Sequence, residues 1–77
     1  MPIEIQYLGV VAEATGKTSE LIDYNGSRAE MLNQVIKKYP GMKDLSFVVA
    51  QNGVITHAET KVMKGDKIAL IPPAPGG

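Results

Sequence analysis

The chain has 77 residues, 44% of them hydrophobic and 21% charged, a composition typical of one small soluble domain with a thin core. Its eight basic and eight acidic residues cancel, so no charge excess indicates binding to nucleic acid or to a membrane surface, and no apolar run approaches the roughly 20 residues of a membrane span. The absence of cysteine excludes disulfides, thiolate metal sites and a cysteine nucleophile.

The first third of the chain predicts two strands. The N-terminus lacks the basic-then-apolar pattern of a signal peptide, which together with the absence of cysteine predicts a cytoplasmic protein. Residues 3–8 alternate apolar and polar side chains with a period of two, except that Leu8 falls on the polar face. Residues 10–14 suit a short helical turn. Residues 18–24 suit a second strand, which should be antiparallel to the first because the link between them is short.

A helix is predicted to begin after Ser27. This serine, with Glu30 three residues later, matches a capping box, in which each side chain accepts a backbone N–H at the helix start. The apolar positions that follow repeat at helical spacing: Ala29, Leu32, Val35, Ile36 and Tyr39. Pro40-Gly41 then ends the helix. The apolar stripe predicts that this helix packs on a sheet.

The remainder of the body predicts strands. Residues 45–51 are too apolar for an exposed edge, and Asn52-Gly53 is a strong signal for a tight turn into a short strand at residues 54–55. A polar loop follows, and a turn at residues 64–66 leads into a final strand, residues 67–71, whose Ile68 and Leu70 should face the helix. One helix on one mixed sheet is an α+β fold.

The chain ends in a stiff arm, Pro72-Pro73-Ala74-Pro75-Gly76-Gly77, directly after the final strand. Each proline fixes φ and removes a backbone donor, so the arm continues neither a central strand nor a helix. Fully extended, six residues reach roughly 20 Å, and a glycine tip can enter a slot too narrow for other residues. The sequence therefore divides into a domain, residues 1–71, and an extended tail, residues 72–77.

The body of the chain shows no catalytic or metal-binding pattern. His57 is the only histidine and lies in a polar segment without partners at ligand spacing. No serine has a histidine placed by sequence to activate it, and the carboxylates are dispersed. The terminal carboxylate of Gly77 is the remaining candidate. It becomes electrophilic only when its oxygen is made a good leaving group, for example through adenylation with ATP.

Three features together resemble a known family: the element order, the turn of Val62 and Gly65-Asp66 into the last strand, and the ending Ile71-Pro72-Pro73-x-x-Gly76-Gly77. The chain resembles the ubiquitin-like β-grasp sulfur carriers, and most closely the small subunit of molybdopterin synthase. Asn52 also falls where that family often has an asparagine. The resemblance implies a β-grasp domain that has no catalytic residues of its own and binds no cofactor.

The resemblance also implies a role for the tail. An adenylyltransferase of the ubiquitin-activating type would use ATP to activate Gly77, and sulfur would replace one oxygen to give a thiocarboxylate. The tail would then enter the large subunit of molybdopterin synthase and supply sulfur for molybdopterin, while Leu8 and Ile71 meet the partner. The chain departs from the family at Pro75, where a small residue is more frequent, and at Ala12-Glu13, where many relatives carry Arg-Glu.

Three alternatives remain open from the sequence. The carrier could serve thiamine synthesis or another sulfur acceptor, although tails of the thiamine type commonly lack the Pro-Pro pair. The chain could be a protein modifier whose Gly77 forms an isopeptide bond with lysine. It could also be an interaction module whose tail is never chemically used.

Overall fold

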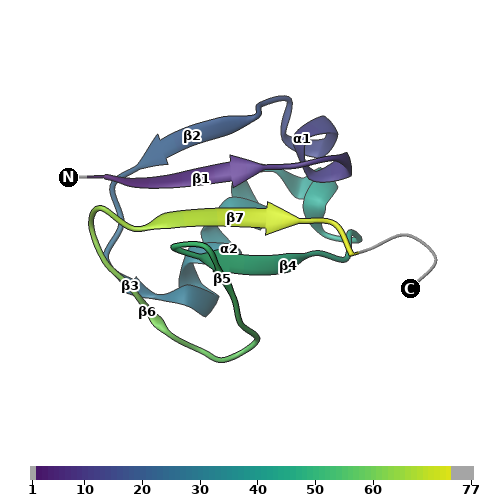
Figure 1. Ribbon diagram of the computed structural model, residues 1–77. Coiled ribbons are helices and arrows are strands. Elements are labelled where there is room, and N and C mark those ends of the chain that lie inside the picture. Colours follow the sequence, from purple (N-terminus) through teal and green to yellow (C-terminus); the bar gives the residue numbers. More distant parts are fainter. Residues whose placement is uncertain (1, 74–77) are drawn as a thin grey trace.

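The computed structural model describes residues 2–73, which form a twisted sheet with one main helix against one face (Figure 1). Within this range, five strands make the main sheet in the order β2-β1-β7-β4-β5. Their bounds are Ile3–Tyr7 for β1, Ser19–Ile22 for β2, Val48–Gln51 for β4, Val54–Ile55 for β5 and Lys67–Ile71 for β7. β1 and β7 are parallel and the other neighbours antiparallel, so the predicted mixed sheet is confirmed.

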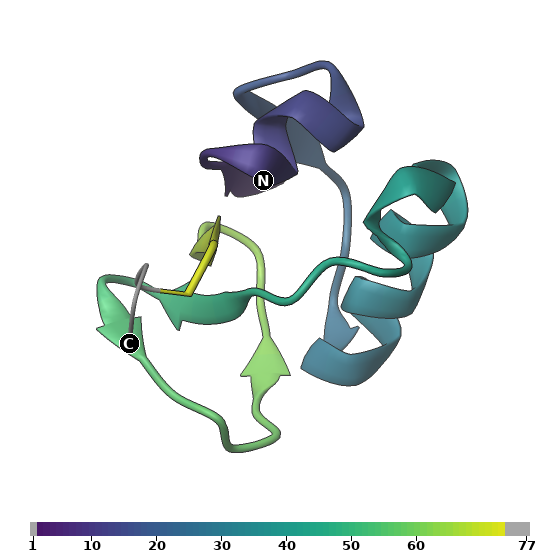
Figure 2. The same cartoon turned by 90° about the vertical axis from the view of Figure 1, so that its right-hand side faces the viewer.

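The helical segments are α1 (Val10–Thr15), α2 (Arg28–Lys38) and the 3-10 turn η1 (Pro40–Met42). Figure 2 shows α2 as a second layer beside the sheet, and Figure 1 shows α1 at the edge where β1 and β7 end. One main helix on a mixed sheet with a central parallel pair is the predicted α+β, β-grasp arrangement. The division between residues 1–71 and a separate tail stays a prediction, because most of the tail lies outside the described range.

The core lies between α2 and the central strands. Alternate residues of β1 and β7 face the helix and are at most 2% exposed: Ile3, Ile5, Tyr7, Ile68 and Leu70. Full burial of an aliphatic side chain of this size contributes roughly 1.5–3 kcal/mol. The predicted inward positions of Ile68 and Leu70 are therefore confirmed.

The predicted apolar stripe of α2 is confirmed at Leu32, Val35, Ile36 and Tyr39, which are buried or packed against the core, and is wrong at Ala29. Arg28, Met31 and Val35 are buried, whereas Ala29 is exposed. The reason is the spacing of three and four residues, which aligns positions 28, 31 and 35 on the face toward the sheet and turns position 29 away. Met31 is 1% exposed, so it is a core residue that the predicted stripe did not include.

A second, two-stranded sheet was not predicted. β3 (Gly26–Ser27) and β6 (Lys61–Val62) pair antiparallel beside the start of α2. Strands of two residues are too short for a periodic pattern, and β3 and β6 are far apart in the sequence, so no tight-turn signal joins them as Asn52-Gly53 joins β4 to β5. The predicted strands at residues 18–24 and 45–51 are also shorter in the structure, as the bounds of β2 and β4 show.

The turn between β4 and β5 has the predicted geometry. Asn52 and Gly53 both have positive φ angles, 51° and 85°, which is the requirement of a type I′ hairpin turn. Glycine takes such angles without strain and asparagine tolerates them better than most residues. The turn therefore sets the pairing of Gln51 with Val54.

Glu20 of β2 connects the sheet to the end of α2. Its Oε1 atom accepts hydrogen bonds from the hydroxyls of Tyr7, at 2.6 Å, and Tyr39, at 2.8 Å. Its Oε2 atom accepts from the ammonium groups of Lys38, at 2.9 Å, and Lys17, at 3.4 Å. The Glu20 side chain is only 9% exposed, so these donors replace its hydration.

The donors around Glu20 set its pKa. Burial is the largest single influence and raises the pKa, but the hydrogen bonds from Tyr7, Lys38 and Tyr39 together outweigh it and lower the pKa from 4.5 to about 2. Burial, followed by the bond to Glu20, raises the pKa of Tyr7. Because the folded pKa of Glu20 lies below its usual value, the ionised carboxylate stabilises the fold above pH 4.5, and this contribution is lost as the pH falls toward 2.

We predict that Glu20→Gln lowers the free energy of unfolding at pH 7 by about 2 kcal/mol, because the amide keeps the shape but loses the charge that the two lysines and the tyrosines bind. The difference from wild type should shrink as the pH falls from 4.5 toward 2. Urea unfolding of both proteins at several pH values measures this difference in the free energy of unfolding. Glu13→Gln, at an exposed position of α1, is the control and should change little. Parallel pH profiles for wild type and Glu20→Gln would contradict the prediction.

Candidate functional site

β7 leads into the tail, and it is paired on both sides up to Leu70 and on the β4 side up to Ile71, its last residue. Leu70 pairs with Tyr7 of β1, and Ile71 pairs with Val48 of β4. The N–H of Leu8 also donates to the carbonyl oxygen of Leu70 at 3.2 Å. The tail therefore begins at the centre of the sheet, at a point where the backbone is held by hydrogen bonds to neighbouring strands.

The structure describes only the first two residues of the predicted tail. Pro72 is partly buried and Pro73 is exposed. The predicted reactive end, Ala74-Pro75-Gly76-Gly77, lies outside the described residues. The roles assigned to these four residues therefore stay predictions.

Leu8 and Ile71 lie on the sheet face that points away from α2. Each follows one residue after the Tyr7–Leu70 pair, so strand alternation turns both outward on neighbouring strands. Leu8 is 42% exposed and Ile71 is partly buried. Val48, the partner of Ile71 on β4, continues the line. We call these three residues the tail-side apolar row. The structure thus brings together the two residues singled out in the sequence, while their contact with a partner stays a prediction.

Gly9 is a residue at the tail that the sequence did not connect with it. A β-carbon added at Gly9 would lie 2.8 Å from Cγ of Pro72, so the proline ring packs directly against the glycine backbone. Nothing in the local pattern links these positions, which lie near opposite ends of the chain. Gly9 was visible in the sequence only as the end of the first strand.

The opposite end of β7 is fixed by side chains. The N–H of Asn52 donates to the Lys67 oxygen at 2.8 Å, and Oδ1 of Asn52 accepts from the Lys67 N–H at 2.9 Å. The Asp66 carboxylate accepts from the Met63 N–H and from the Asn52 amide, and these bonds, that of Met63 most strongly, lower the pKa of Asp66. Asn52 therefore fastens the hairpin turn to the start of the strand that carries the tail.

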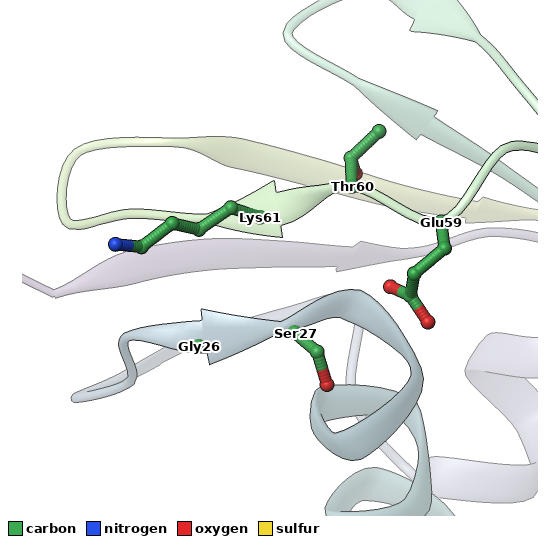
Figure 3. Close-up of a pocket in the computed structure, with 5 residues that line it drawn as sticks. All are labelled: Gly26, Ser27, Glu59, Thr60 and Lys61. Atoms are coloured by element: carbon green, nitrogen blue, oxygen red, sulfur yellow. The ribbon is translucent and has the colours of Figure 1, made fainter.

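A shallow hollow of about 420 Å³ lies beside the first turn of α2. It is lined by Gly26, Ser27, Glu59, Thr60 and Lys61 (Figure 3). Figure 3 shows the Glu59 side chain extending from its loop toward the start of the helix. The position invites comparison with the anion sites that many proteins build at helix N-termini.

The backbone donors beside this hollow are already used. Each of the first three N–H groups of α2 donates within the fold: Arg28 to the Thr60 oxygen at 2.9 Å, Ala29 to Oε1 of Glu59 at 3.1 Å and Glu30 to Oγ of Ser27 at 3.2 Å. The Glu59 carboxylate would also repel an anion. Among residues 2–73 the predicted return bond from the Glu30 side chain is not formed, and Glu59 provides the second cap from a distant loop. The hollow is therefore a capped helix end.

Other kinds of site were sought in the same part of the chain. Residues 2–73 contain no group of three or more His, Asp or Glu side chains placed to share a metal ion. His57 lies exposed in the loop between β5 and β6. The expectation that the protein binds no metal or cofactor stays a prediction. No helix in the described range has the length and apolar character needed to span a membrane.

A known family matches almost the whole chain. The ThiS family aligns with residues 5–77. The chain belongs to the ThiS family. The matched range includes most of β1, all of β7 and the complete tail, so membership in the ThiS family covers both the fold and the candidate site.

The chain is similar in sequence to a curated relative and similar in fold to solved structures. The molybdopterin synthase sulfur carrier subunit of Phaeosphaeria nodorum is 27% identical over 84 residues, covering 95% of this chain and 88% of the relative. The crystal structure of SAMP1 from Haloferax volcanii superposes with a TM-score of 0.83 at 20% identity, over 100% of both chains. The complex of subunits 1 and 2 of molybdopterin-converting factor from Helicobacter pylori contains a chain that superposes with a TM-score of 0.73 at 24% identity, again over 100% of both.

We predict that Glu59→Ala lowers the free energy of unfolding by about 1 kcal/mol, because the Ala29 N–H loses its acceptor and the helix dipole loses a nearby negative charge. Urea unfolding measures this change. His57→Ala, at an exposed position of the same loop, is the control and should leave stability unchanged. Equal unfolding midpoints for Glu59→Ala and wild type would contradict the assignment of Glu59 as a cap.

Proposed function

We propose that this chain is a cytoplasmic sulfur carrier that serves as the small subunit of a molybdopterin synthase, with Gly77 as the residue that carries sulfur. The observation that carries the proposal is the ending Pro-Pro-x-x-Gly-Gly placed directly after a central strand that is paired on both sides. Membership in the ThiS family supports it. The names of the Phaeosphaeria nodorum relative and of the Helicobacter pylori complex favour molybdopterin synthase as the destination.

The proposed chemistry takes place at the terminal carboxylate. An adenylyltransferase of the ubiquitin-activating type joins this carboxylate to AMP at the expense of ATP, with release of pyrophosphate. Hydrosulfide (HS⁻) then attacks the carbonyl carbon, the bond from carbon to the AMP oxygen breaks and AMP leaves with its electron pair, which gives the thiocarboxylate. The tail contributes a tip without side chains, Gly76-Gly77, and prolines that reduce the entropy lost when the arm is ordered in a partner.

The proposed docking surface for the large subunit is the tail-side apolar row. An exposed leucine beside the point where the tail leaves is placed to be covered when the tail enters a partner's active site. Burial of such a side chain at an interface contributes to affinity in proportion to the apolar area removed from water. The lack of an arginine at position 12 leaves this contact more apolar than the family pattern.

A second candidate function is protein modification, in which Gly77 forms an isopeptide bond with a lysine. The observation that favours it is the likeness to SAMP1, which related solved structures name small archaeal modifier protein 1. The two functions share the adenylation step and differ in the nucleophile that attacks. Covalent adducts of the chain with other proteins on a denaturing gel would indicate modification.

We predict that the protein isolated from its native host contains a fraction whose intact mass is raised by replacement of one oxygen with sulfur. A variant that ends at Pro75 should fold, because β7 ends at Ile71, and should never acquire this mass. Intact-mass spectrometry measures both, and circular dichroism confirms the fold of the truncated chain. Consistent absence of the mass shift from the wild-type protein would contradict the carrier function and favour an interaction module. Acquisition of sulfur by the truncated variant would contradict the role of Gly77.

We predict that Leu8→Asp weakens binding to the large subunit of molybdopterin synthase at least tenfold, because a charge at the centre of an apolar contact loses its hydration on binding. Leu21→Asp is the matched control. Leu21 is 68% exposed on β2 and pairs with Glu4, near the far end of β1 from the tail. It should bind as wild type does. Isothermal titration calorimetry measures the affinities, and equal affinity for Leu8→Asp and wild type would contradict the docking surface.

A further inference from the structure

The contact between Gly9 and Pro72 leaves no room for a side chain at position 9. A β-carbon there would lie 2.8 Å from Cγ of Pro72 and 3.6 Å from its Cδ. Carbon atoms that are not bonded approach most favourably at about 3.5–4.0 Å, so the shorter of these separations is a clash. The ring of Pro72 therefore fits only against a residue without a β-carbon.

The backbone of Gly9 is firmly held. Its φ and ψ angles are 54° and −130°, a combination that residues with a β-carbon essentially avoid. The N–H of Leu8 donates to Leu70 of β7 at 3.2 Å, and the carbonyl oxygen of Leu8 accepts from Val11 at 3.0 Å. The carbonyl oxygen of Gly9 accepts from Glu13 of α1 at 3.3 Å. Gly9 is thus fixed between the central strand and the first helix.

Pro72 is the residue at which the chain turns away from the sheet. The ring fixes φ near −65°, and the following Pro73 restricts ψ of Pro72 to extended values. Because both backbone dihedral angles of Pro72 are restricted, the direction of the chain after β7 depends mainly on the residue against which the Pro72 ring packs. The ring is partly buried against Gly9, whereas Pro73 is already exposed.

We propose that Gly9 is a positioning residue for the C-terminal tail: its bare backbone is the seat for the ring of Pro72, and this seat sets the direction in which the chain leaves β7. A side chain at position 9 would push the ring aside and redirect the arm at its first residue. The geometric part of this proposal does not depend on what the tail carries. Its consequence for sulfur delivery rests on the proposed function.

The geometric part can be tested without any sulfur chemistry. Because the chain has no cysteine, Asn33→Cys on the exposed side of α2 and Ala74→Cys in the tail provide two unique sites for spin labels. Pulsed electron spin resonance then measures the distance distribution between them. We expect Gly9→Ala to shift or broaden this distribution. Gly53→Ala is the control, because Gly53 has a φ of 85° but open space around it, so alanine there adds backbone strain without a clash.

A double-variant cycle separates the clash from the strain. Pro72→Ala removes Cγ and Cδ, so in that background Gly9→Ala should cause no further change in the distance distribution. An unchanged distribution for Gly9→Ala in the wild-type background would overturn the proposal. An equal shift in both backgrounds would also overturn it, because the shift would then come from the loop alone. If Gly9→Ala fails to fold, Pro72→Ala is compared with Pro73→Ala, which frees φ one residue later but removes an exposed ring. Greater broadening for Pro72→Ala supports the seat, and equal broadening overturns it.

The functional consequence has its own readout. With the purified adenylyltransferase and a sulfur donor, Gly9→Ala should form the thiocarboxylate or transfer sulfur to the large subunit more slowly by on the order of tenfold, because a misplaced reacting group loses much of its rate. Gly53→Ala should react as wild type does. If wild type acquires no sulfur, the proposed function fails while the distance measurement still decides the role of Gly9. If the distances shift but the rates are equal, the seat exists and its importance for delivery is overturned.

Discussion

The parallel pairing of β1 with β7 is the constraint on which the rest of the structure depends. It places the first and last strands side by side at the centre of the sheet, so that both end at the same edge. The segment after β1 therefore lies beside the residue that follows β7, and Leu8 and Gly9 become neighbours of the tail. An antiparallel arrangement of the same two strands would have put Leu8 and Gly9 at the opposite edge.

The two faces of this central pair of strands differ in their side chains and in their burial. Toward α2, closely packed aliphatic side chains and the carboxylate of Glu20, with its four donors, make a rigid body. Away from α2, the tail-side apolar row lies next to the tail, with Leu8 42% exposed and Val48 and Ile71 partly buried. Under the proposed function, a rigid body would be useful because a fixed starting point reduces the freedom that the tail loses on entering a partner.

The sequence was a good guide to the fold and an incomplete guide to the site. The alternation at residues 3–7, the serine cap of α2 and the Asn52-Gly53 turn were all confirmed, and Leu8 was correctly singled out as a residue that does not face the core. The contact of Gly9 with Pro72 was missed because a glycine after a strand has no distinctive pattern. Ala29 was placed in the core by its apolar character, although the helix turns it outward.

The sequence by itself determined the features that depend on residues close together in the chain. The tertiary structure decided the contacts between residues that are far apart in the chain. Caps, tight turns, strand alternation and the stiffness of a proline arm depend on residues within about four positions of one another, so each leaves a local signature. The capping of α2 by Glu59, the bond from Tyr39 to Glu20 and the seat of Pro72 on Gly9 join distant segments. Such contacts arise only when the strand order brings those segments together, and no local preference at either residue records them.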